Sequence, residues 1–143
     1  MSDRPVSAIV GTRKPFTLPP KTTVGKAARL MKQSKASAVM VVEHAHLVGI
    51  FTERDALFRV LAEGRDPQTT VIAEVMTPDP QTIEPDKPFR YALILMYEHG
   101  FRHLPVVEDG KPIGMVSASD ALDPELLDFA SDVGVREHIR DIL

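Results

Sequence analysis

Two stretches of the chain place apolar residues at the spacing of an amphipathic helix. Because positions i, i+3, i+4 and i+7 share one helical face, this spacing predicts two helices with one buried side each. Thr22 or Thr23 can cap the first helix. Asp86 can cap the second, with Pro88 in its first turn, and Gly100 is placed to end it. The two apolar stripes are Val24, Ala27, Ala28 and Met31, and Phe89, Ala92, Leu93 and Met96.

Short apolar runs after each predicted helix indicate buried strands. A polar turn joins the two runs of each pair, and the dipeptide Asp109-Gly110 in the second turn favours a hairpin. A further short edge strand precedes each helix, and a further helix follows each strand pair. The expected strands are 38–42, 47–51, 104–107 and 113–116, with edge strands at Thr17-Leu18 and Thr82-Ile83 and helices that open at Thr52 and Ser117.

The two sets of elements belong to an internal repeat. Residues 6–55 (copy one) align without a gap with residues 71–120 (copy two) at an offset of 65, with 15 identities in 50 positions. Chance would give about three or four at average residue usage. The sequence therefore predicts an α/β (α+β) fold of two β-α-β-β-α halves, packed about a pseudo-twofold axis with related clefts between them.

The chain divides into three expected parts: repeat 1 at residues 1–65, repeat 2 at residues 66–122, and a C-terminal helical tail at residues 123–143. Asp123-Pro124 interrupts the last helix of copy two after barely two turns and makes a good start for a new helix. We expect the tail in two pieces broken near Gly134. An apolar stripe at the end of the tail is formed by Val135, Ile139 and Ile142.

Composition narrows the classes of protein. A chain of 143 residues with 43% hydrophobic and 26% charged residues suits a soluble globular protein of one domain or two small halves sharing a core. The net charge of −3 gives no case for binding nucleic acid or an anionic membrane. There is no cysteine, no signal-peptide pattern and no long apolar run. We expect a cytoplasmic protein.

One motif occurs in both copies and suits ligand chemistry. Residues 49–55 and 114–120 share the pattern Gly-x-x-Thr/Ser-x-x-Asp at the end of a strand and the start of a helix. First-turn N–H groups attract phosphate, and the carboxylate can accept two hydroxyl hydrogen bonds, as from a ribose diol. The alternative is a capping box, which only starts a helix. Two occurrences in one register, each with Gly three residues ahead, favour a pair of ligand sites.

With this signature, the β-α-β-β-α order and the run His103-Leu104-Pro105-Val106-Val107, both halves resemble cystathionine β-synthase (CBS) domains. The resemblance covers about residues 6–122 and implies a stand-alone CBS pair that binds adenine nucleotides or other adenosyl ligands in the cleft between its halves. It also implies that the two sites have diverged, because copy one has Ser37 and Ala38 where copy two has Arg102 and His103.

The resemblance also assigns roles to residues. It makes the two signature aspartates ribose acceptors and the two signature hydroxyls their partners. It places the side chains at the start of the second strand near phosphate, with Arg54 as the substitute in copy one, and two threonines beside the base or sugar. The signature glycines allow close approach. The candidate ligand-binding residues are Thr52, Asp55, Ser117, Asp120, Arg54, Arg102, His103, Thr12, Thr77, Gly49 and Gly114.

These assignments favour a non-catalytic regulatory module that senses an adenosyl ligand such as AMP, ADP, ATP, S-adenosylmethionine or NAD and signals to an unidentified effector protein. The alternative is a structural module that dimerises through its helices without a ligand. No catalytic motif supports an enzyme, no resident cofactor is expected, and His44 and His46 lack a third metal ligand. The faces for homodimerisation would include Leu57, Phe58, Leu61, Tyr91 and Leu95.

Overall fold

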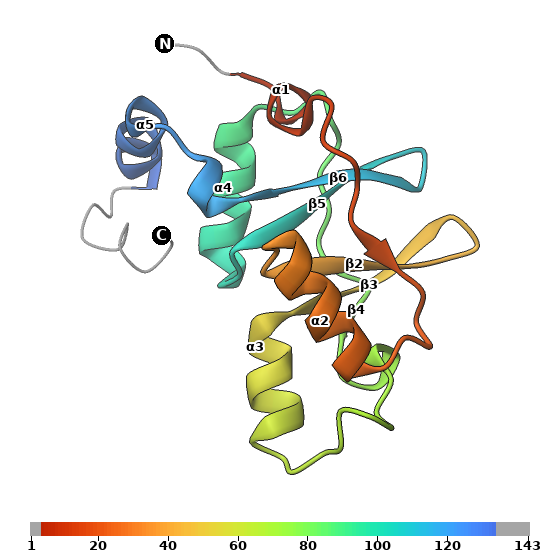
Figure 1. Cartoon of the computed structure of the whole chain (residues 1–143). Helices are drawn as coiled ribbons and strands as arrows, with labels where there is room; N and C mark the ends of the chain where they lie inside the picture. The colour runs from red at the N-terminus through yellow and green to blue at the C-terminus, as the bar shows by residue number, and fades with distance from the viewer. Residues whose placement is uncertain (1–3, 134–143) are drawn as a thin grey trace. The chain divides into compact units, whose positions relative to one another are not determined.

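The computed structural model describes residues 4–133, which form two compact units (Figure 1). The copy-one unit comprises residues 15–80 and 110–112, and the copy-two unit comprises the described residues of 1–14, 81–109 and 113–143. The units are thus interleaved along the chain. The boundaries expected at residues 65 and 122 stay predictions.

The copy-one unit is built on a four-stranded sheet in the order β1-β2-β3-β4. Strand β1 runs parallel to β2, whereas β2–β3 and β3–β4 are antiparallel pairs. Helix α3 continues directly into the π-helical segment η1. The elements of this unit are β1 (Thr17–Leu18), α2 (Val24–Ser34), β2 (Ala38–Glu43), β3 (His46–Thr52), α3 (Glu53–Asp55), η1 (Ala56–Leu61), η2 (Ile72–Glu74) and β4 (Thr77–Pro78).

Helix α2 forms as its sequence predicts. Thr23 caps it, because its side chain accepts a hydrogen bond from the Lys26 N–H at 3.2 Å. The predicted stripe is buried except for Ala28, which is exposed. The buried side meets an aliphatic core with one central aromatic ring, Phe51. The other buried members of this core are Val24, Ala27, Met31, Val39, Val41, Val60, Ile72 and Val75.

The copy-two unit has the same plan with fewer strands. At the predicted edge strand Thr82-Ile83, the pairing is limited to one parallel bridge between Ile83 and Val106, with two backbone hydrogen bonds of 3.0 Å. The helix predicted at Ser117 is a single 3₁₀ turn, since Ala121 already has extended backbone. The elements are α1 (Val6–Val10), α4 (Phe89–His99), β5 (His103–Glu108), β6 (Lys111–Ser117), η3 (Ala118–Asp120) and α5 (Asp123–Val133).

The start of α4 corrects a second prediction. The N-cap position is Pro88, not Asp86, and no side chain caps the helix. Instead, the first N–H group, that of Phe89, donates to the carbonyl of Arg4 at 2.9 Å. The cap therefore comes from a distant backbone segment. The predicted end is confirmed, because Gly100 has the left-handed φ of 73° that favours glycine.

The segment that precedes each copy's first strand packs on the other copy. Helix α1, at the start of copy one, buries its apolar residues Val6, Ile9 and Val10 beside Phe89 of copy two. The corresponding segment η2, at the start of copy two, buries Ile72 in the core of the copy-one unit. Neither segment was predicted as an element, and this exchange explains why the units are interleaved.

Helix α5 begins at Asp123, as predicted, and packs beside α4. Its Phe129 ring is fully buried and meets Tyr97 edge-on, with 5.6 Å between ring centroids. The predicted break near Gly134 and the stripe of Val135, Ile139 and Ile142 lie outside the described residues. Within residues 4–133, no helix is long and apolar enough to cross a membrane.

Candidate functional site

The copy-one signature forms a complete capping box at the junction of β3 and α3. The Thr52 N–H donates to Asp55 Oδ2 at 2.9 Å, and the Asp55 N–H donates to Thr52 Oγ1 at 3.3 Å. The Thr52 hydroxyl also donates to the same carboxylate oxygen at 3.2 Å. The capping box that the motif allows is therefore present, but it uses only the Oδ2 oxygen of Asp55.

The second carboxylate oxygen of Asp55 faces an arginine one helical turn on. Arg59 Nε lies 3.5 Å from Asp55 Oδ1. The same guanidinium donates to the carbonyls of Val75 and Met76 at 3.2 and 3.0 Å. Arg59 therefore ties the signature carboxylate to the segment before β4.

Burial changes the acidity of this carboxylate. Asp55 is only 7% exposed, and this desolvation raises the pKa of its carboxyl. The hydrogen bonds from Thr52 and the charge of Arg59 oppose the shift, but the pKa remains above its ordinary value. Donors that stabilise the ionised form, such as ligand hydroxyls, would lower this pKa.

The copy-two signature also has the geometry of a capping box. The Ser117 N–H donates to Asp120 Oδ2 at 2.9 Å. The Ser117 hydroxyl also contacts the hydroxyl of Ser119 at 2.7 Å. The other carboxylate oxygen, Asp120 Oδ1, lies 3.3 Å from Arg13 Nη2. Arg13 belongs to the segment exchanged from the start of the chain.

The two sites thus divide the carboxylate in the same way. In each, Oδ2 accepts the backbone N–H of the capping box, and Oδ1 faces an arginine. A carboxylate has two oxygens with about four acceptor positions, so capping and ligand binding are compatible roles for one aspartate. A ribose hydroxyl at Oδ1 would compete with an arginine and not with the helix cap.

Several backbone N–H groups at the two signature turns are already bonded. The N–H of Glu53 donates to the Ser37 carbonyl at 3.0 Å, and that of Ala118 donates to the Arg102 carbonyl at 3.1 Å. The N–H groups of the two signature hydroxyl residues donate to the aspartates. These N–H groups are therefore not available to a phosphate without a rearrangement of the turns.

The remaining predicted residues are distributed unevenly. The Arg102 carbonyl accepts a hydrogen bond from the Ala118 N–H, so Arg102 lies beside the copy-two signature. The side chain of Arg102 is exposed, and that of His103, which begins β5, is half-buried. Arg54 is exposed, and the arginine at Asp55 is Arg59 instead. Thr12 and Thr77 are both exposed, Thr77 in β4 and Thr12 in the turn after α1. Their ligand roles stay predictions.

The signature glycines accommodate the exchanged segments. A Cβ on Gly49 would lie 2.3 Å from Met76 Sδ, and a Cβ on Gly114 would lie 2.5 Å from Val10 Cγ1. The close approach predicted at these glycines is made by protein side chains, one in each unit.

We expect Gly114→Ala to destabilise the protein by about 1–3 kcal/mol, because Val10 is β-branched and buried and cannot move aside. Gly49→Ala is the matched control. There the flexible Met76 side chain can repack, and we expect a cost below about 1 kcal/mol. Urea denaturation of both variants measures the difference. Equal costs, or a larger cost at Gly49, would contradict this packing role.

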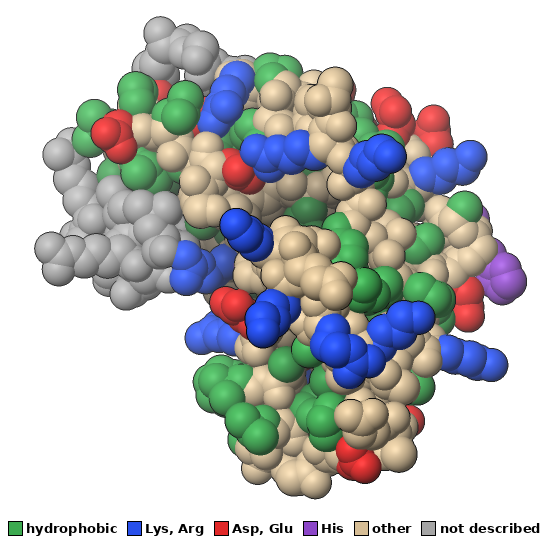
Figure 2. Space-filling view, viewed as in Figure 1, with side chains coloured by type: hydrophobic (Ala, Val, Ile, Leu, Met, Phe, Trp, Pro, Cys, Tyr) green, Lys and Arg blue, Asp and Glu red, His purple; other side chains and the backbone are tan. Residues whose placement is uncertain are grey.

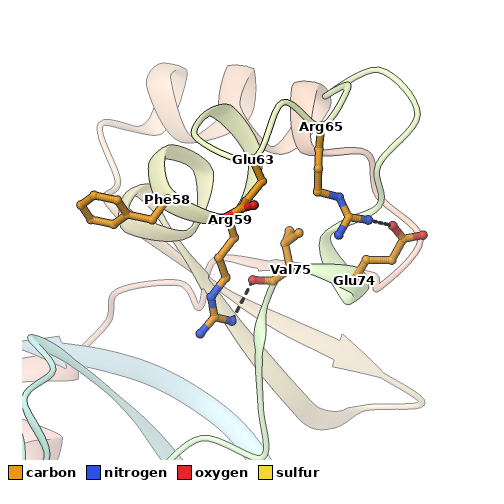
Figure 3. A pocket seen from close by; sticks show the side chains of 6 residues that line it. All are labelled: Phe58, Arg59, Glu63, Arg65, Glu74 and Val75. Carbon is orange, nitrogen blue, oxygen red and sulfur yellow. Dashed lines mark hydrogen bonds and ion pairs between the residues drawn. The ribbon is translucent and has the colours of Figure 1, made fainter.

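A pocket of about 490 Å³ lies beside the copy-one signature, between η1 and the η2 segment (Figure 3). Its arginines are already engaged, Arg65 with Glu74 and Arg59 with the carbonyl groups described above. The pocket therefore adds no uncommitted arginine to the copy-one site. The residues that line it are Phe58, Arg59, Glu63, Arg65, Glu74 and Val75.

Three residues at these sites were missed by the sequence interpretation: Arg13, Arg59 and Ser119. Arg59 stands four residues after Asp55, a spacing that pairs opposite charges on a helix, so the sequence did carry a signal for it. Arg13 is 107 residues from Asp120, and no local pattern links them.

Two similar α/β units, each with an aspartate held at a strand-to-helix turn, define a tandem-repeat module. The sequence matches the CBS domain over residues 6–62 and 72–124, which is most of the chain. This protein therefore belongs to the CBS domain family, as its signature predicted, with two CBS domains in tandem.

Known relatives agree with this family. The CBS domain-containing protein YhcV from Bacillus subtilis is 38% identical over 109 residues, which are 76% of this chain and 77% of that protein. A CBS-domain containing protein from Agrobacterium tumefaciens, of known structure, is 28% identical, covers 82% of this chain and 95% of its own, and has a TM-score of 0.75.

A third relative has the same fold at lower identity. A CBS domain protein from Pyrobaculum aerophilum, solved in complex with AMP, is 23% identical with a TM-score of 0.80 and covers 90% of this chain and 99% of its own. Several other curated relatives are much longer, and the chain spans only 16% to 55% of them.

Proposed function

We propose that this CBS pair is a regulatory module that binds an adenosine-containing ligand at Asp55 and Asp120. One observation carries the proposal: in both copies, the signature aspartate keeps Oδ1 outside the capping box and turned to a polar partner. A helix cap alone needs one oxygen. The AMP-bound relative from Pyrobaculum aerophilum supports the class of ligand.

The chemistry of the sites suits such a ligand. Each carboxylate can accept a ribose hydroxyl at Oδ1 when its arginine moves aside. Side-chain cations would bind phosphate, because the N–H groups of Glu53 and Ala118 are already bonded to carbonyls. Binding would regulate a partner only through a difference in ligand affinity between two conformations of the protein. The effector protein would recognise one of these conformations.

Titration with AMP, ADP, ATP, S-adenosylmethionine and NAD tests the proposal. A ligand at 100 times its Kd should stabilise the fold by about 2.7 kcal/mol. We expect Asp55→Asn and Asp120→Asn to weaken binding at their respective sites by about 1–3 kcal/mol, measured by isothermal titration. Asparagine keeps one oxygen for the cap and replaces the other with an NH₂ donor, which cannot accept a ribose hydroxyl.

Glu53→Gln is the matched control, because it removes an exposed carboxylate from the same helix start without touching the capping box. The Glu53→Gln variant should bind the ligand with the same affinity as the unmodified protein. No response to any of the five compounds would rule out the proposed ligand class. Unchanged affinity in both aspartate variants would reduce the signature to a helix cap.

A second candidate function is dimerisation or partner binding without a ligand. Three apolar side chains of the α3–η1 helix are exposed, Leu57 at 49%, Phe58 at 55% and Leu61 at 72%. Figure 2 shows hydrophobic side chains gathered over this helix. Tyr91 on α4 is also exposed, whereas Leu95 is half-buried. A protein that ignores all five compounds in the titration would favour this candidate.

A further inference from the structure

We propose that Arg13 makes the Asp120 site selective for adenosine ligands that carry phosphate over uncharged ones. This inference rests on the proposed function and assigns a specificity-determining residue to one of its two sites. Arg13 lies outside the signature and outside the second-strand positions that the family resemblance pointed to.

The two arginines at the signature aspartates are held differently. The side chain of Arg13 is 57% exposed, and within residues 4–133 the guanidinium forms a hydrogen bond and ion pair with Asp120 alone. Arg59 makes two further hydrogen bonds to the carbonyls of Val75 and Met76. Arg13 can therefore leave its aspartate at low cost, whereas Arg59 is fixed by three acceptors.

The repeat shows that each arginine is specific to its own site. At the offset of 65, Arg13 corresponds to Pro78, and the residue 65 positions after Arg59, just beyond the aligned repeat, is Pro124. Neither proline can replace the charge. The Asp120 site thus receives its cation from the exchanged N-terminal segment, and the Asp55 site receives its cation from its own helix.

This arrangement gives different results for charged and uncharged ligands. A ribose hydroxyl that binds Asp120 Oδ1 displaces the Arg13 guanidinium. With adenosine, the displaced guanidinium gains no new partner. With AMP, it can bind the phosphate oxygens, for which the planar guanidinium is well suited. The backbone N–H of Ala118 is already bonded to the Arg102 carbonyl and does not compete with Arg13 for phosphate.

Titrations of adenosine and AMP against Arg13→Gln test the inference. They are made in an Asp55→Asn background, so that the Asp120 site gives the signal. We expect Arg13→Gln to weaken AMP binding about tenfold or more and to leave adenosine binding equal or tighter, because a charge-assisted bond to phosphate is lost and Asp120 is freed. Added salt should reduce the AMP preference of the Arg13 protein.

Lys14→Gln is the matched control. It removes the same charge from the neighbouring exposed residue and should leave the ratio of AMP to adenosine affinity unchanged. Thermal unfolding of each variant confirms that it is folded. If Arg13→Gln loses affinity for both ligands equally, or loses no affinity for AMP, the inference is overturned.

The failure of the proposed function gives a different result. If the unmodified protein binds neither compound nor any other adenosyl ligand, the proposed function fails, and this inference fails with it. If the unmodified protein binds AMP and the Asp55→Asn protein does not, the function stands and the inference is overturned, because the ligand then binds at Asp55.

Discussion

Alanine at Val6, Ile9 and Val10 should unfold the part of the protein built from copy two, although these residues begin copy one. All three side chains are at most 6% exposed and lie in one core with Phe89 and Leu93. Losing this much buried volume should destabilise the copy-two unit by roughly 4–8 kcal/mol. A loss of this size is comparable to the whole stability of a small domain.

Residue-resolved hydrogen exchange measures this effect. The triple variant should lose protection first in β5 and β6 and later in β2 and β3. The matched control is the double variant Ile72→Ala and Val75→Ala, since these residues lie in the other core. The control should give the reverse order. Early loss of β2 and β3 in the α1 variant would contradict the exchanged packing.

The sequence predicted the elements better than their partners. Stripes and turns are local, so α2, α4 and the four long strands could be predicted from spacing alone. The exchange of α1 and η2 could not, because both segments share the valines Val6/Val71 and Val10/Val75 and would suit either core. Which core a segment joins depends on how the intervening chain is routed, and no local pattern records that.

The start of α4 shows how a distant contact overrides a local rule. Aspartate is one of the preferred N-cap residues, so the local sequence favours a cap at Asp86. The Arg4 carbonyl reaches the first helical N–H instead, and the helix then starts at Phe89. Local propensities describe a helix end correctly only when no other segment supplies the missing acceptor.

The candidate site was predictable to a similar degree. The motif placed Thr52, Asp55, Ser117 and Asp120 at the turns where the structure has them, because the motif also encodes the turn. A choice between cap and ligand site could not be made from the pattern, since the same carboxylate has room for both roles. Arg13 required the fold, because only packing of the exchanged segment brings it to Asp120.

Arg4→Leu should destabilise the copy-two unit by about 3 kcal/mol, because it leaves the mostly buried carboxylate of Glu125 without its ion-pair partner. Arg4 binds Glu125 through two hydrogen bonds of 2.8 Å and donates to the Asp120 carbonyl at 2.8 Å. The side chain of Glu125 is 11% exposed, and its other donor is the Leu122 N–H. Urea denaturation at neutral pH measures the loss.

The double variant Arg4→Leu and Glu125→Leu is the control for this pair. It removes both charges, so it should be more stable than Arg4→Leu alone. The guanidinium carbon of Arg4 lies 5.5 Å from the centre of the Phe89 ring. A double variant that is less stable would mean that this cation–π contact contributes more to stability than the ion pair.

The effect of Arg4→Leu should also depend on pH. Burial alone would raise the pKa of Glu125, but the hydrogen bonds from Arg4 and Leu122 hold this pKa below its ordinary value. A carboxyl with a lowered folded-state pKa stabilises the fold fully above its unfolded pKa of about 4.3 and loses that contribution as the pH falls through the folded value. The stability gap between the unmodified protein and Arg4→Leu should therefore narrow below about pH 4. A gap that stays constant down to pH 2.5, roughly the lower end of the usual acid range, would show that the ion pair contributes nothing.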